Sequence, residues 1–342
     1  MTKGLLLFIV FNFVCQASIN AQQNRWQINA TGGITWPVSD SNEHKDHIEM
    51  SGKYISAVIR YGVNPDQSLY LNRGIVWPML RTIPNNTHAS LTRTFNTDIV
   101  NQINFNKRPA VKERVDEISL DGKITIKSTI NEKFQLLRVL FPSTDKPLFC
   151  EKYVLLNKSE KPANIEVPHI DNILLTNAAD GVEGSYSLRV QSGNAGAFII
   201  QPGDSITFYL SISGAKTGQD AGVQDIEKEL LKRSDFVKYL SHNLVLETPD
   251  EILNKAFAFA KIRASESIYQ TKGGPLHGPG GLSYYAAIWA NDQAEYINPF
   301  FPFLGYDYGV ESALNAYRQF ARFMNPGFKP IPSSIIAEGT DI

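Results

Sequence analysis

The stretch Ser205-Ile-Thr-Phe-Tyr-Leu-Ser-Ile-Ser213 decides how the first two thirds of the chain fold. Its apolar and more polar residues alternate with a period of two, which is typical of an antiparallel strand buried on one face only. The apolar face is predicted to consist of Ile206, Phe208, Leu210 and Ile212.

Shorter stretches before this strand repeat the pattern. The segment 123–127 alternates in the same way after the turn Asp121-Gly122. The segments 153–156 and 165–167 flank a polar connection, 157–162, and are predicted to form a hairpin. Many short strands separated by turn signals indicate a sandwich of antiparallel sheets, which we expect to span 22–222.

The pattern changes from strand to helix near Val223. Apolar residues recur among charges from Gln224 to Leu240, as in an amphipathic helix. We expect a linker helix within 223–247 that holds the sandwich against the region that follows.

Two longer helices are predicted in 248–342. Thr248 as N-cap, Pro249 in the first turn and Glu251 three residues after the threonine form a capping box. A third helix starts near Val310 and stops at Asn325-Pro326-Gly327. In the helix that follows Thr248, the predicted buried stripe is Leu253, Phe257, Ala260, Ala264 and Ile268. In the helix near Val310, it is Val310, Ala313, Leu314, Tyr317, Phe320, Ala321 and Met324.

The stretch 273–293 carries the strongest functional signal. Gly273-Gly-Pro-Leu-His-Gly-Pro-Gly-Gly281 is predicted to be a mobile loop that approaches a ligand closely. Aromatic residues follow, and Asp292 then stands at the start of a short predicted helix, 292–297, which Asn298-Pro299 is expected to break. Aromatic rings beside a carboxylate at a helix start indicate a carbohydrate site.

Taken together, these features resemble the six-hairpin glycosidases, a superfamily with an (α/α)6 barrel and an N-terminal β-sandwich of the supersandwich kind. The motifs that carry the resemblance are Trp-Ala-Asn-Asp-Gln at 289–293, Asn-Pro-Phe-Phe-Pro-Phe-Leu-Gly at 298–305 and Ile-Pro-Ser-Ser-Ile-Ile-Ala-Glu-Gly at 331–339. The resemblance implies that 248–342 is the first part of such a barrel, so the chain is expected to be cut short.

The resemblance also implies roles for individual residues. Asp292 is similar to a carboxylate that grips sugar hydroxyls, with capping of its own helix as the alternative role. Trp289, Tyr284 and Tyr285 are candidates for stacking on a sugar ring, with core packing as the alternative. His277 is a candidate hydrogen-bonding partner of the sugar, with an incidental loop residue as the alternative.

Glycosidic cleavage ordinarily needs two carboxyl groups. Glu338 follows the apolar run 335–337 and is the candidate general acid, because partial desolvation would raise its pKa. The alternative is that Glu338 caps or decorates the next helix. The resemblance places the second carboxylate beyond Ile342 and implies an inverting mechanism.

Composition excludes nucleic acid as an expected binding partner. The net charge is −1 and the sequence has no basic tract that would bind a polyanion, so a neutral carbohydrate is the expected partner. Neither a cofactor nor a metal is expected, and the run 43–47, which contains His44 and His47, is interpreted as a solvated loop.

The N-terminus is typical of an exported protein. A basic start, an apolar run too short to span a membrane and a small residue at Ala21 predict a signal peptide over 1–21. Cleavage there would remove Cys15 and leave Cys150 without a disulfide partner, as a buried and inert thiol. The mature protein is expected to be periplasmic or extracellular.

The sequence therefore predicts an exported glycoside hydrolase, or a fragment of one that lacks activity by itself. The alternative is a carbohydrate-binding or interaction protein without catalysis, built mainly from the sandwich. Such a binder would present aromatic residues on an exposed strand face, whereas the enzyme would gather Trp289, Asp292, His277 and Glu338 in one cup.

Overall fold

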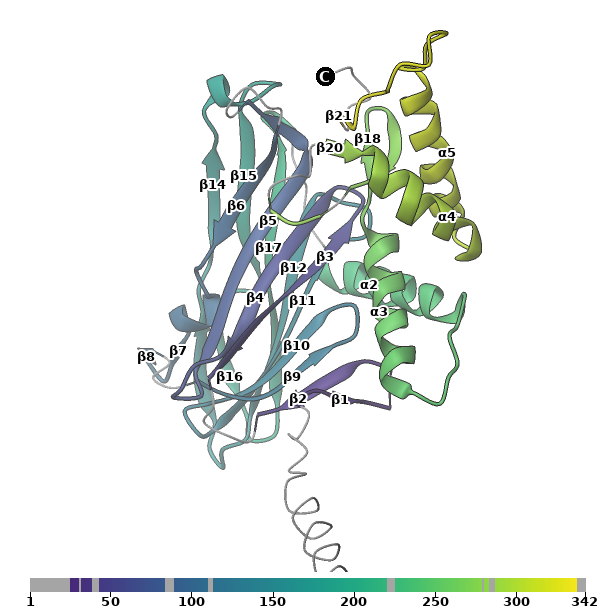
Figure 1. Ribbon diagram of the computed structural model, residues 1–342. Helices are drawn as coiled ribbons and strands as arrows, with labels where there is room; N and C mark the ends of the chain where they lie inside the picture. The colour runs from purple at the N-terminus through teal and green to yellow at the C-terminus, as the bar shows by residue number, and fades with distance from the viewer. Residues whose placement is uncertain are drawn as a thin grey trace, which may run out of the picture.

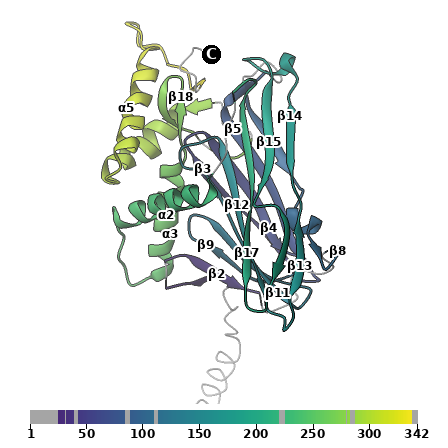
Figure 2. The same ribbon diagram turned by 180° about the vertical axis from the view of Figure 1, so that it is seen from behind.

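The structure of the chain is a computed structural model, which describes residues 25–30, 32–38, 43–83, 89–109, 113–219, 225–278, 280–282 and 287–336. Two layers of antiparallel sheet form one side of the molecule, and the helices gather on the other side (Figure 1 and Figure 2). The predicted signal peptide over 1–21 lies outside the described residues.

The larger layer is a nine-stranded antiparallel sheet. Its strand β17 (Ser205–Lys216) contains the stretch that predicted the fold, and Phe208, Leu210 and Ile212 are buried as expected. In spatial order the strands are β1 (Gln27–Ile28), β2 (Ile34–Pro37), β9 (Glu113–Leu120), β10 (Ile124–Ile130), β11 (Phe134–Pro142), β12 (Leu148–Asn157), β17, β15 (Tyr186–Gly193) and β14 (Asp171–Leu175).

The second layer consists of two four-stranded sheets. One contains β3 (His44–Gly52), β4 (Ile55–Val63), β5 (Leu69–Thr82) and β6 (Ala89–Phe95) in that order. The other contains β16 (Gly196–Ile200), β13 (Ala163–Val167), β7 (Asn104–Phe105) and β8 (Arg108–Pro109). Two short 3-10 helices, η1 (Ile99–Gln102) and η2 (Ala178–Asp180), connect strands.

Two sequence-based expectations about these strands are wrong. The predicted hairpin of 153–156 with 165–167 does not form, because β12 and β13 belong to different layers. The Asn157 amide, which donates to the carbonyls of Lys161 and Ile200 at 2.9 and 3.0 Å, holds the chain where it crosses between the layers. The predicted loop at 43–47 is largely the start of β3, which is paired with β4.

The interior of the sandwich contains charged groups as well as apolar side chains. Arg73 and Arg138 are fully buried. Arg73 of β5 binds Glu151 of β12, with Nη2 2.8 Å from Oε2, and so joins the two layers. Arg138 of β11 binds Asp98 at 2.6 Å and Glu113 at 2.5 Å. Although burial opposes ionisation, the two guanidinium groups lower the pKa of Asp98.

The helix α2 (Ile226–His242) covers part of the outer face of the large sheet. Its N-cap Asp225 accepts a hydrogen bond from the amide of Lys228 at 3.1 Å. Ile226 packs with Phe141 and Cys150. Cys150 is fully buried, and burial raises the pKa of its thiol, so the expectation of a buried, protonated cysteine is confirmed.

The helix α3 (Glu251–Glu266) starts two residues later than the predicted capping box. Asp250 is its N-cap and accepts from the amides of Ile252 and Leu253, whereas Thr248 binds Asn254. The predicted buried stripe is wrong for most of its length, because Leu253 is 50% exposed and the buried positions are Lys261, Ser265 and Glu266.

Arg233 of α2 connects both layers to α3. Its side chain is fully buried and donates to the carbonyl of Gly122 at 2.8 Å and to that of Ser51 at 2.8 Å. It also binds the buried carboxylate of Glu266 on α3. The helices are therefore held against the sandwich by a buried ion pair as well as by apolar contacts.

The last part of the described chain combines short strands with helical turns. Its elements are β18 (Ile268–Thr271), β19 (Gly274–His277), β20 (Ala287–Trp289), η3 (Asp292–Ile297), α4 (Asn298–Phe300), η4 (Phe301–Phe303), α5 (Asp307–Ala321) and β21 (Ser334–Ile336). Asn298-Pro299 does not break the short helix, because the helical backbone continues into α4.

The predicted buried face of α5 is only partly right. Ala313 and Phe320 are buried as predicted. Leu314 is 50%, Tyr317 53% and Met324 73% exposed, so the apolar side chains of the other flank lack cover within the part of the chain that the structure describes. None of the helices in that part is long and apolar enough to cross a membrane.

Candidate functional site

Trp289 and Asp292 lie at the junction of a strand and a helix. β20 pairs with β21 so that Trp289 stands opposite Ser334, and the amide of Ala290 donates to the carbonyl of Ser333 at 2.8 Å. Ile288 is buried in a small core with Leu276. Because neighbouring side chains alternate along a strand, the half-buried Trp289 points away from that core.

Asp292 lies inside the first helical turn and is not its N-cap. The preceding residue, Asn291, already has helical angles, with φ −63° and ψ −47°, and it makes no capping hydrogen bond. The segment Asp292–Ile297 is a π-helix, a rare geometry that occurs frequently at functional sites.

His277 lies in a strand, which corrects the prediction of a mobile loop at this position. β18 and β19 form a hairpin in which His277 pairs with Ile268. The hairpin turn is held by Asn315 of α5, which donates to the carbonyls of Gly273 and Pro275 at 2.8 and 3.0 Å.

The His277 side chain is only 8% exposed, and its ring lies edge-on to Phe301 with centroids 6.0 Å apart. Burial, with a smaller contribution from the charge of Arg263, lowers the pKa of His277 to about 3. The imidazole is therefore neutral near pH 7, and a role as a proton-donating imidazolium is excluded.

Gln293 connects His277 to the π-helix. Its Nε2 donates to the carbonyl of His277 at 3.0 Å, and the side chain is almost fully buried. The structure thus brings β19 and the Trp289–Asp292 segment together. Gln293 was not among the predicted site residues, although it directly follows Asp292 in the motif 289–293.

Several buried polar atoms in this region have no hydrogen-bond partner among the residues that the structure describes. Buried polar groups in proteins are nearly always paired, so each exception calls for an explanation such as a ligand or an ordered water. The unpartnered atoms are His277 Nδ1, Gln293 Oε1, both amide atoms of Asn298, Ser265 Oγ and Ser312 Oγ.

Three candidate residues, Tyr284, Tyr285 and Glu338, lie outside the described residues. Tyr285 precedes β20 by two positions, and Glu338 follows β21 by two positions. The antiparallel pairing sets Ala287 opposite Ile336, so the described ends of the chain next to both residues are neighbours. The roles given to Tyr285 and Glu338 stay predictions.

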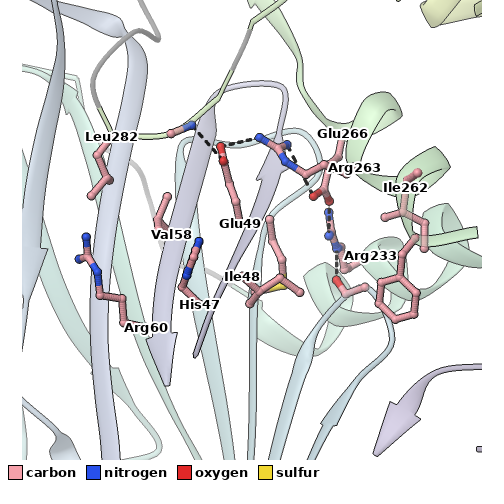
Figure 3. Close-up of a pocket in the computed structure, with 15 residues that line it drawn as sticks. His47, Ile48, Glu49, Val58, Arg60, Arg233, Ile262, Arg263, Glu266 and Leu282 are labelled. Carbon is pink, nitrogen blue, oxygen red and sulfur yellow. Dashed lines mark hydrogen bonds and ion pairs between the residues drawn. The ribbon is translucent and has the colours of Figure 1, made fainter. Parts of the chain in front are cut away.

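A separate cleft of about 650 Å³ lies between the β3–β4 pair and α3 (Figure 3). A chain of interactions forms one of its walls: the Gly281 amide donates to Glu49 at 3.0 Å, Glu49 binds Arg263 at 2.6 Å, and Arg263 is 3.9 Å from Glu266, the partner of Arg233. No sequence pattern predicted this cleft, because its residues are brought together from distant strands and helices.

No metal site was expected, and that absence stays an expectation. Across the described ranges, no group of three or more histidine, cysteine, aspartate or glutamate side chains is arranged to hold a metal ion. His44 and His47 lie on β3, and His47 is exposed, with Nδ1 4.0 Å from Asp46.

Comparisons with known proteins identify the fold. No protein-family model and no curated protein matches the chain. A solved structure described as "Putative kojibiose phosphorylase from human microbiome" matches with a TM-score of 0.54 at 8% identity, covering 87% of this chain and 50% of that chain. A bacterial glucoamylase complexed with acarbose matches with a TM-score of 0.39 at 9% identity, covering 90% of this chain and 53% of that chain.

The chain thus spans about half the length of both structures. The first match shows a shared fold, in which an antiparallel β domain is followed by part of a helical domain.

Proposed function

We propose that this chain carries the sandwich and the first helices of an exported, carbohydrate-active enzyme of the six-hairpin type, which cleaves glycosidic bonds. The sandwich would extend over 22–222, the linker over 223–247 and the catalytic region from 248 onward, after removal of a signal peptide at 1–21. The fold shared with a protein described as a kojibiose phosphorylase supports the carbohydrate class.

The observation that carries the proposal is the placement of Trp289 and Asp292. They lie at the start of a π-helix. Gln293, which follows Asp292, is buried and donates a hydrogen bond to the carbonyl of His277 on β19. An ionised carboxylate can accept hydrogen bonds from two sugar hydroxyls, and an indole face can cover the apolar face of the ring. In this proposal Asp292 positions the sugar, and Glu338 donates the proton to the leaving oxygen.

The glycosidic bond could be cleaved by hydrolysis or by phosphorolysis, depending on whether water or inorganic phosphate is the nucleophile. With water as the nucleophile, a second carboxylate would act as base and the product would be a free sugar of inverted configuration. With inorganic phosphate, as the name of the matched phosphorylase suggests, the product would be a sugar phosphate. Product analysis with and without phosphate separates hydrolysis from phosphorolysis.

The proposal is tested by Asp292→Asn, because asparagine keeps the shape of the side chain and removes its charge. Affinity for a bound neutral sugar, measured by calorimetry with kojibiose and related α-glucosides, should fall by roughly 1–3 kcal/mol through loss of charge-assisted hydrogen bonds. Asp307→Asn is a matched control, since Asp307 is an exposed carboxylate in the first turn of α5. Unchanged affinity in the Asp292 variant would reject its role in sugar binding.

A further inference from the structure

We infer that the cleft between the β3–β4 pair and α3 is a second carbohydrate site, which binds an anionic sugar through its carboxylate. Its volume of about 650 Å³ falls within the range of roughly 300–1,000 Å³ that is usual for small-molecule sites. Of the predicted sugar-binding residues that the structure describes, Trp289, Asp292 and His277, none lines it. The cleft is therefore distinct from the Trp289–Asp292 site.

The charged residues that line the cleft differ in whether they form ion pairs. Arg233, Arg263, Glu49 and Glu266 are all engaged in the ion pairs of the wall, and His47 lies 4.0 Å from Asp46. Among the described charged residues that line the cleft, Arg60 is the one with no ion pair. Its guanidinium makes a single long contact, 3.5 Å, with the side-chain oxygen of Asn72.

The position of Arg60 makes its guanidinium accessible. Arg60 is exposed in the middle of β4, where it pairs with His47 on one side and Asn72 on the other. In Figure 3 it stands across the cleft from the helix that carries Arg263. A guanidinium group can donate two parallel hydrogen bonds to one carboxylate. The guanidinium of Arg60 could therefore bind the carboxylate of a ligand in the cleft.

The remaining lining suits a sugar ring. Phe259 of α3 and Leu282 supply apolar surface, and Val58 of β4 stands beside Arg60 on the same strand. Leu282 lies over Gly74, where a Cβ atom would come within 3.1 Å of its side chain. One free cation beside an apolar wall indicates a hexuronate, which carries a carboxylate on a ring with apolar faces.

The inference is tested with trigalacturonate as the probe and its methyl ester as the matched neutral ligand. Calorimetry at low salt should give saturable binding of the acid, at least about tenfold weaker binding of the ester, and weakening of the acid's binding as salt is added. Arg60→Gln should weaken binding of the acid at least about tenfold. Arg93→Gln, at an exposed arginine of β6 that does not line the cleft, should leave it unchanged.

Two further variants complete the test. Ala260→Trp places a bulky side chain at an exposed position of α3 that lines the cleft, and should abolish binding while the melting temperature is retained. Asp292→Asn should leave binding of the acid unchanged, which separates this inference from the proposed function. Equal affinity for the acid and its ester, an unchanged Kd in Arg60→Gln, or no saturable binding at millimolar concentrations would overturn it.

Discussion

Large buried charges of the sandwich and buried amide and hydroxyl groups of the helical region differ in how they are paired. In the sandwich, Arg73 and Arg138 are fully buried and each is paired with a carboxylate, although Ser128 Oγ is buried without a hydrogen-bond partner among the described residues. In the helical region, Arg233 and Glu266 form a buried ion pair, whereas the buried side chains of Asn298 and Ser312 have no hydrogen-bond partner among the described residues. Paired groups of this kind stabilise one arrangement of the chain, whereas unpaired ones cost stability and are retained mainly where function requires them.

Apolar surface shows the same contrast. The sandwich encloses two apolar clusters between its layers and leaves Ile173 and Ile199 exposed at its edges, whereas Leu253 of α3, Leu314 and Tyr317 of α5 and the following Met324 are half or more exposed on the helices and just after them. An apolar flank on a helix is ordinarily covered by a neighbouring element or a ligand. We therefore propose a supporting role for the sandwich and keep the candidate chemistry of Trp289 and Asp292, on the helical side, as a proposal.

The largest expected effect is in the sandwich. Arg138→Leu would remove the counter-charge of Glu113 and one of the two guanidinium groups next to Asp98, both carboxylates being largely buried, and should lower the free energy of unfolding by about 3–5 kcal/mol. Urea denaturation measures this change. Arg114→Leu breaks an exposed ion pair with Asp116 and should cost less than about 1 kcal/mol. Similar decreases in the free energy of unfolding in both variants would show that the buried ion pairs of Arg138 stabilise the fold no more than an exposed pair does.

The second expected effect is a pH dependence that arises in the helical region. Because the pKa of His277 is about 3 in the folded protein, below its unfolded value of about 6.5, the unfolded chain binds the extra proton between these values. Stability from this group is complete above pH 6.5 and is lost as the pH falls, by about 2 kcal/mol between pH 7 and pH 5. In His277→Phe this part of the loss should vanish. An identical pH profile in both proteins would contradict the buried, neutral imidazole.

The smallest expected effect compares two buried asparagines directly. Asn298→Leu removes an amide without partners and should raise the free energy of unfolding by about 1 kcal/mol. Asn157→Leu, in the sandwich, removes an amide that binds two carbonyls and accepts from Ser159, and should lower it by more than about 2 kcal/mol. Destabilisation by both would show that Asn298 has a partner in solution and that the contrast between the regions is smaller than stated.

The sequence predicted the elements of this fold better than their contacts. The alternation in 205–213 and the charged helix before Leu240 depend on local periodicity, and both are present as β17 and α2. The pairing of β13 could not be read locally, since it depends on the layer to which the chain crosses at Asn157. The buried face of α3 was missed because buried polar groups, Lys261 and Glu266, occupy it instead of an apolar stripe.

For the candidate site, the motif 289–293 predicted a helix over 292–297, which is present, although the helical backbone already includes Asn291. The glycine-rich stretch was misinterpreted. Glycine and proline in 273–281 suggested a loop, while α5 holds the turn of a hairpin there and buries His277. Such a contact between segments about 40 residues apart leaves no local pattern. The cleft beside Arg60 was missed for the same reason.

One measurement tests the central claim that the sugar site lies on the helical side. The chain has four tryptophans: Trp26, Trp36 and Trp77 belong to the sandwich, and Trp289 follows it. Fluorine NMR of protein labelled with 5-fluorotryptophan, with resonances assigned by Trp→Phe variants, is recorded during titration with neutral α-glucosides. We predict that the Trp289 resonance shifts saturably while the other three stay unchanged. Saturable shifts confined to Trp26, Trp36 or Trp77 would contradict this account and favour a carbohydrate-binding sandwich.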